Sequence, residues 1–156
     1  MNASHVAAGV DVLSGEQRAL CVTMAAWLRA QRHVASLGIV FTAVALLGLT
    51  AVASTGRLAT TCGLALTAVV LLGLAERVLA LRLDFDARLF DALADGRLPT
   101  LTLLDAALSG LGLRPAGPLR ALPDRINGTQ RLLRLHWLMT LLQLLGLAGA
   151  LLLLAT

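Results

Sequence analysis

Apolar residues gather in three long blocks along the chain, separated by segments in which arginines and carboxylates recur. The blocks cover residues 34–54, 58–75 and 132–155, and none of them contains a carboxylate. At 1.5 Å per helical residue, each block crosses or nearly crosses a hydrocarbon core of roughly 30 Å. The pattern therefore predicts an all-α integral membrane protein with three transmembrane helices.

The second block continues into a charged segment without a proline that would stop a helix. Beyond Ala75 the helical period survives, with charged side chains on one arc and apolar side chains on the opposite arc. The charged arc holds Arg77, Asp84, Arg88, Asp91 and Asp95, and the apolar arc holds Val78, Leu81, Phe85, Leu89 and Leu93. We predict one helix over residues 57–95 that leaves the membrane and continues to a C-cap at Gly96.

The other segments predict an N-terminal amphipathic helix and an amphipathic helical connector between the second and third spans. Ser14 and Gln17 have capping-box spacing, so a helix begins there and either lies on the membrane or extends the first span as a soluble segment. A short apolar helix over residues 101–109 either lies on the membrane face or packs against the Phe85 and Leu89 side of the long helix. An irregular, glycine- and proline-rich segment follows, and Asn127 or Thr129 is expected to cap the third span.

Small and polar side chains form stripes on the predicted spans. Small stripes let helix backbones approach closely in lipid, so we predict that the stripes of the first two helices face each other. They consist of Ala35, Gly38, Thr42 and Ala45, and of Ala59, Gly63 and Thr67. A polar amide in hydrocarbon requires a partner, so the third helix is expected to turn its polar face toward protein. That face holds His136, Thr140, Gln143 and Ala150, with Gly146 beside it.

Composition and charge limit the kinds of partner that the protein can have and predict its orientation in the membrane. Hydrophobic residues make up 58% of the chain and charged residues 14%, which is too little polar surface for a soluble protein. Aromatic residues make up 3%, so stacking platforms for nucleic acid are not expected. All 13 basic residues are arginine, and only Arg57 lies in the loop between the first two spans. The positive-inside rule then predicts a multi-pass protein of the bacterial inner membrane, with a cytoplasmic N-terminus and a periplasmic or external C-terminus.

This topology divides the chain into four regions. They are a tail with an amphipathic helix (1–33), a transmembrane hairpin (34–81), a cytoplasmic connector (82–131) and a third span (132–156). Cys21 and Cys62 fall on opposite sides of the membrane, so they are not expected to pair. The histidines and cysteines lack the spacing of a metal site, and the sequence contains no phosphate loop or nucleophile elbow. A noncatalytic protein without a resident metal or cofactor is therefore expected.

One histidine pair leaves a cofactor function open. His33 begins the first span and His136 lies near the start of the third, so the two are expected at similar depth on the cytoplasmic side. Two such histidines suit haem b or quinone, as in a membrane anchor of a redox complex. A holin-like pore is a further alternative, because the polar stripe of the third helix offers a partial path for water.

The leading hypothesis is an accessory or scaffold subunit that assembles with other membrane proteins or with copies of itself. Arg82 and Asp86 have i,i+4 spacing within the apolar arc, so they form either a local ion pair or a charged contact to a partner. The residues expected to mediate interactions share small size, polarity in the span, or exposure beyond it. They are Gly38, Thr42, Gly63, Thr67, Arg82, Phe85, Asp86, Leu89, Gln143, Gly146 and Ala150.

Overall fold

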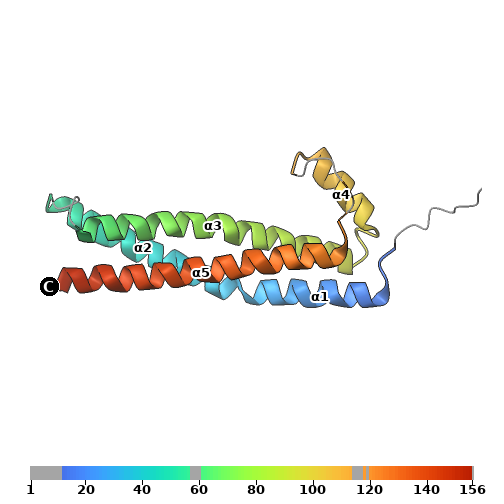
Figure 1. Ribbon diagram of the computed structural model, residues 1–156, viewed down its shortest axis with the longest axis horizontal. Helices are drawn as coiled ribbons and strands as arrows, with labels where there is room; N and C mark the ends of the chain where they lie inside the picture. The colour runs from blue at the N-terminus through green and yellow to red at the C-terminus, as the bar shows by residue number, and fades with distance from the viewer. Residues whose placement is uncertain (1–11, 57–60, 114–117, 119, 156) are drawn as a thin grey trace, which may run out of the picture.

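The computed structural model describes residues 12–56, 61–113, 118 and 120–155, and within these ranges the chain is a rod of helices. The helices are α1 (Gly15–Ala30), α2 (Arg32–Ser54), α3 (Thr61–Ala94), α4 (Leu101–Gly110) and α5 (Leu122–Ala155). Helices α1 and α2 follow each other almost end to end, while α3 and α5 each run most of the length of the rod (Figure 1). The predicted all-α membrane fold is confirmed, because three helical segments are long and apolar enough to cross a membrane.

Helix α3 is the central element of the rod. It is continuous from Thr61 to Ala94, so the predicted helix does pass through Glu76 into the charged segment without a break. It packs against α1, α2 and α5. Gly96 follows its end with φ of 72° and a backbone N–H that donates to the Leu93 carbonyl, as expected for a glycine that terminates a helix. Residues 57–60 of the predicted helix lie outside the described residues.

Helix α5 begins earlier than the sequence indicated. It starts at Leu122, so neither Asn127 nor Thr129 caps it, and that prediction was wrong. The helix tolerates Pro123 because this residue lies in the first turn, where a backbone N–H has no partner within the helix. Thr129 is buried, and its hydroxyl donates to Asp86 Oδ2 at 3.1 Å. Residues 122–131, the end of the predicted connector, are therefore a direct extension of the third span.

The charged half of the rod has its own hydrophobic core. Ser14 and Gln17 form the predicted capping box, and the apolar face of α1 packs against α3, so α1 is an extension of the α2 rod. Helix α4 contributes Leu104 to this core, and Leu89 of α3 packs against the same cluster, whereas Phe85 stays 41% exposed. The buried members of this core are Leu13, Cys21, Met24, Ala25, Leu28, Leu83, Ala87, Phe90, Leu93, Leu104, Leu122 and Leu133.

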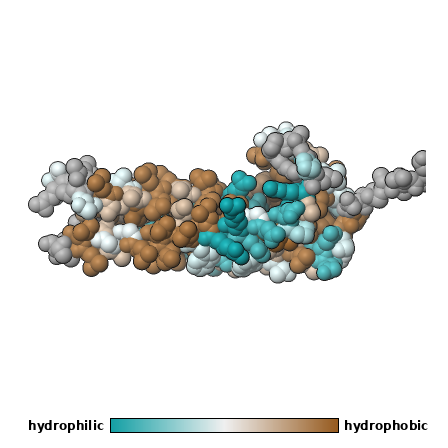
Figure 2. Space-filling view, viewed as in Figure 1, coloured by the Kyte–Doolittle hydropathy of each residue, from teal (hydrophilic) through white to brown (hydrophobic). Residues whose placement is uncertain are grey.

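The other half of the rod is apolar on its outside. Figure 2 shows hydrophobic side chains covering one half, and the hydrophilic side chains gathered on the other half. The uncharged stretches 34–54, 61–75 and 137–153 make up the apolar half, which is the part that crosses the membrane. Its interior is a small core of Ala45, Val52, Cys62, Leu66, Val69, Leu147 and Ala150. The rod therefore consists of a membrane-spanning half and a charged half that share α3 and α5.

Two phenylalanines on α3 differ in burial, so replacing each one tests the hydrophobic core of the charged half. Phe90 is 4% exposed, whereas Phe85 is 41% exposed. Phe90→Ala is expected to lower the free energy of unfolding in detergent by about 3–5 kcal/mol, because it leaves a cavity in the core. Phe85→Ala, the matched control, is expected to cost about 1 kcal/mol or less. Equal losses in thermal unfolding followed by circular dichroism would contradict a core built on Phe90.

Candidate functional site: a buried polar junction

Three helices meet at a single buried carboxylate where the two halves of the rod join. Glu76 of α3 is 0% exposed. Arg77 donates to its carboxylate from Nε at 2.9 Å and from Nη2 at 2.8 Å, and Arg77 Nη2 also donates to the Ala35 carbonyl of α2. His136 of α5 places Nδ1 3.2 Å from Glu76 Oε1, within ion-pair distance although not aligned as a hydrogen bond. The carboxylate thus touches groups from all three membrane-crossing helices.

A glycine on α2 makes room for this carboxylate. A Cβ atom placed on Gly38 would lie 2.6 Å from Glu76 Oε2 and 2.8 Å from its carboxyl carbon. Both distances are shorter than real Cβ contacts allow, and the carboxylate is held by Arg77, so it has little freedom to move away. Gly38 therefore lets α2 approach α3 at this depth, which is the role that small residues play in membrane helices.

A second polar contact lies one helical turn deeper in the membrane. Gln143 of α5 is 0% exposed, and its Nε2 donates to Thr42 Oγ1 of α2 at 3.1 Å. The Thr42 hydroxyl in turn donates to the Gly38 carbonyl at 2.7 Å. Gly73 of α3 completes this layer, since an added Cβ there would lie 2.6 Å from Gln143 Nε2. The two polar layers together connect α2, α3 and α5.

The junction combines tight pairing with incomplete hydrogen bonding. Gln143 Oε1 and His136 Nδ1 are buried and make no hydrogen bond within the part of the chain that the structure describes. The 3.2 Å approach of His136 Nδ1 to Glu76 Oε1 is an ion pair only when the imidazole ring is protonated. Among the described residues, no group of three or more His, Cys, Asp and Glu side chains is arranged to hold a metal ion.

Several of the predicted site residues, three interaction candidates and the cofactor candidate His136 among them, lie together at this junction or next to it. Gly38, Thr42, Gln143 and His136 are in the two polar layers. Gly146 is in close contact with α3, because an added Cβ would lie 2.8 Å from Val69 Cγ2. The backbone carbonyl of Ala150 accepts a weak hydrogen bond from Cys62 Sγ at 3.7 Å. The polar face of the third helix therefore does point at protein, and the protein it meets is its own chain.

The predicted pairing of the two small stripes is only half right. Helix α2 does approach α3 along its small residues, but the residues opposite Gly38 and Thr42 are Glu76 and Gly73. Thr67 is exposed, and its hydroxyl donates to the Gly63 carbonyl within its own helix at 2.8 Å. Thr67 thus faces away from α2. Ala59 of the same stripe lies outside the described residues.

The remaining predicted site residues lie on the surface or in the charged half of the rod. His33 is exposed, whereas His136 is 1% exposed and has Nδ1 3.2 Å from Glu76 Oε1. Asp86 accepts the hydrogen bond from Thr129 on α5, and Arg82 is exposed. Leu89 is partly buried against the core of the charged half.

Sequence reasoning missed Glu76, Arg77 and Gly73 as members of the site. The predicted apolar block ended at Ala75, and Glu76 was assigned to neither arc of the charged segment, although helical geometry places it on the buried face. At 100° per residue it lies on the same face as Val69 and Leu83, which are buried, and away from Arg88, which is exposed. A carboxylate on the buried face of a span was the signal that could have identified the junction.

Two glycines in the membrane-crossing helices test how tightly the junction is packed. Gly38→Ala would bring a methyl group against Glu76 and is expected to lower the free energy of unfolding by about 1–3 kcal/mol. Gly149 of α5 has no atom within 4 Å of an added Cβ. Gly149→Ala is therefore the matched control, expected to be neutral or to stabilise by up to about 1 kcal/mol. Denaturant unfolding in micelles that ranked the two variants equally would contradict this geometry.

Two aspartates in the charged half give opposite dependences of stability on pH. Burial raises the pKa of the Asp86 carboxyl, and the hydrogen bond from Thr129 and the charges of Arg82 and Arg125 oppose it. The hydrogen bond from Arg32 is the largest cause that lowers the pKa of Asp84, with Arg88 adding to it and burial opposing it. The folded state therefore favours the protonated form of Asp86 and the ionised form of Asp84.

Replacing each aspartate by asparagine tests the directions of these two pKa shifts. Protonated Asp86 contributes stability that is lost as pH rises from the unfolded pKa, about 3.9, through the raised folded value. Asp86→Asn keeps an oxygen for Thr129 without a charge, so it is expected to raise the melting temperature at pH 7 and to match wild type at low pH. Asp84 contributes stability at neutral pH that is lost as pH falls through its depressed folded pKa, so Asp84→Asn is expected to lower the melting temperature at pH 7. Shifts of the same sign at pH 7 would refute the assignment.

The chain was compared with protein families, curated proteins and solved structures. No protein family matches the chain, and searches of curated proteins and of solved structures found no similar protein. What the protein does must therefore be argued from its own residues.

Proposed function

We propose that the protein is a noncatalytic integral-membrane subunit that assembles with other membrane proteins or with copies of itself. The observation that carries this proposal is an apolar ridge on α3 beyond the polar junction. The ridge consists of Val78, Leu81 and Phe85, whose exposed fractions are 67%, 73% and 41%. These side chains belong to the part of α3 that also carries its charged residues, so the ridge is a surface for a partner where the rod leaves the hydrocarbon.

The internal packing of the chain narrows the choice of docking surface. Gln143 was a predicted contact residue, but it is 0% exposed and is used inside the bundle, as are Phe90 and Leu93, which are 4% and 1% exposed. The ridge on α3 has no such role, and Arg82 lies beside it on the exposed side of the helix. Exposed apolar residues that continue beyond a membrane-crossing segment are typical of a contact surface between proteins.

The distribution of arginine supports a particular orientation for this subunit. Twelve of the 13 arginines lie in α1, at the first residue of α2, in α3 and the segment that follows it, or in the first half of α5, and Arg57 is the exception. By the positive-inside rule, the charged half faces the cytoplasm of a bacterial inner membrane, and the C-terminus faces the periplasm or exterior. The partner would then be met at the cytoplasmic end of the rod.

The redox and pore alternatives gain no comparable support. A haem or quinone site shared by His33 and His136 needs the two side chains near each other, and His33 is exposed while His136 contacts Glu76. A pore needs the polar stripe of α5 to face water, and Thr140 and Gln143 are buried in the bundle. The assembly function is the one that the exposed side chains favour.

A ridge variant tests the proposal in the protein as it exists in native membranes. Leu81→Gln with Phe85→Ala removes most of the ridge without touching a buried side chain. After extraction into polymer nanodiscs, wild type is expected to carry stoichiometric partner mass, either multiples of its own chain or a defined second membrane protein. The ridge variant is expected to lose at least about tenfold in occupancy, because each exposed apolar side chain contributes on the order of 1 kcal/mol when covered.

The control removes an equivalent apolar side chain elsewhere. Val22 of α1 is 55% exposed, so Val22→Gln lowers apolar surface without altering the ridge. Its complex is expected to match wild type in native mass spectra. The proposal fails if gently extracted wild type is monomeric and partner-free, or if the ridge variant keeps its complex as fully as Val22→Gln does.

A further inference from the structure

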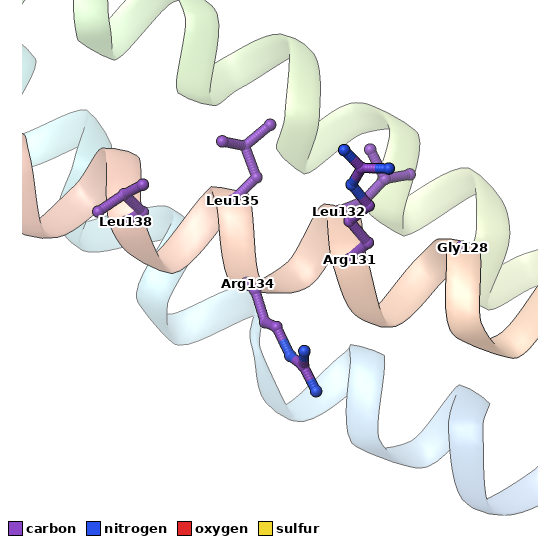
Figure 3. Close-up of a pocket in the computed structure, with 6 residues that line it drawn as sticks. All are labelled: Gly128, Arg131, Leu132, Arg134, Leu135 and Leu138. Atoms are coloured by element: carbon purple, nitrogen blue, oxygen red, sulfur yellow. The ribbon is translucent and has the colours of Figure 1, made fainter.

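A shallow notch along α5 lies beside the polar junction, at the edge of the membrane-crossing half. It has a volume of about 360 Å³ and is lined by Gly128, Arg131, Leu132, Arg134, Leu135 and Leu138. Figure 3 shows Arg131 and Arg134 leaving α5 in opposite directions, with the leucines between and beyond them. From this geometry we infer that the notch binds an anionic phospholipid, with the headgroup phosphate near the arginines and an acyl chain along the leucines.

The position of the notch matches the headgroup layer. Two contacts between α3 and α5 bracket it: Glu76 with His136 toward the membrane, and Asp86 with Thr129 toward the charged end. Arg131 and Arg134 fall between these two levels on α5. Arginines at this depth can extend their guanidinium groups into the headgroup layer while their stems stay against apolar surface.

These two arginines differ from most others in the chain by lacking a carboxylate partner. The paired arginines are Arg29, Arg32, Arg77, Arg88, Arg97 and Arg125, each of which bonds an Asp or Glu side chain. Within the described ranges, Arg131 and Arg134 make no ion pair, and both are exposed. Each guanidinium group beside the notch is thus free to bind a phosphate with charge-assisted hydrogen bonds.

The floor of the notch commits the ligand to a lipid and not to a free phosphate. Leu135 and Leu138 are 38% and 49% exposed, and the same side of α5 continues into the membrane-crossing half with Leu142 and Leu145 exposed. A soluble phosphate would leave this apolar strip uncovered, whereas an acyl chain covers it along its length. Gly128 keeps the outer end open, because no atom lies within 4 Å of an added Cβ there.

The site can be tested on delipidated protein in detergent by native mass spectrometry at stepped lipid concentrations. The probes are phosphatidylglycerol, cardiolipin and, as the zwitterionic reference, phosphatidylcholine. Wild type is expected to bind the two anionic lipids more tightly than phosphatidylcholine. Arg131→Gln and Arg134→Gln are each expected to weaken anionic-lipid binding about fivefold, since one basic residue near an anionic headgroup contributes about 1 kcal/mol.

Two further variants separate the notch from general charge and from folding. Arg18 of α1 is another exposed arginine without an ion pair in the described residues, so Arg18→Gln removes the same charge far from the notch and is expected to bind lipid as wild type does. Gly128→Leu fills the notch, leaves the charge unchanged and improves helix propensity, so it is expected to weaken anionic-lipid binding without lowering the melting temperature.

Three outcomes would overturn the inference. The first is equal lipid affinity for Arg18→Gln and the two notch arginine variants. The second is unchanged binding by Gly128→Leu. The third is displacement of phosphatidylglycerol by inorganic phosphate at millimolar concentration, which would identify a site for free phosphate.

Discussion

A charged carboxylate cannot remain buried in a membrane protein unless other groups compensate its charge, and the rest of this structure depends on how Glu76 meets that requirement. Arg77 supplies the opposite charge from the neighbouring position on α3, and His136 approaches from α5. Arg77 also bonds the Ala35 carbonyl of α2. One residue pair on α3 therefore fixes where both other spans lie along it, because sliding either helix by a turn would leave the buried charge with fewer partners.

That fixed register determines what each half of the rod can expose. With Gly38 against Glu76 and Gln143 against Thr42, the polar side chains of the junction point inward, and most leucines of the spans point outward to lipid. The same alignment carries α3 and α5 out of the membrane together, so that α1 and α4 can close a second hydrophobic core around them. Continuous helices transmit the position of the junction to the charged half. The ridge on α3 and the notch on α5 lie where they do for this reason.

The architecture could be predicted from the sequence because its signals are long and redundant. Charge-free blocks, the helical period beyond Glu76 and the capping box at Ser14 each extend over several residues, and all three features are present in the structure. The start of α5 was placed too late because residues 122–131 lack a strong apolar period. Their helix is stabilised instead by tertiary contacts, such as Leu122 in the core and Thr129 with Asp86.

The junction could be only half predicted, because it depends on the register between helices. An amide side chain within a membrane span needs a hydrogen-bond partner, so the sequence alone predicts that Gln143 faces protein. That the partner is Thr42, and that Gly38 faces a carboxylate, depends on how far α2 and α5 are shifted along α3, which no single helix encodes. Glu76 illustrates the limit most clearly. By composition, a carboxylate at the end of an apolar block indicates the boundary with water. Its helical face instead places it in the interior, and in the structure Glu76 is buried.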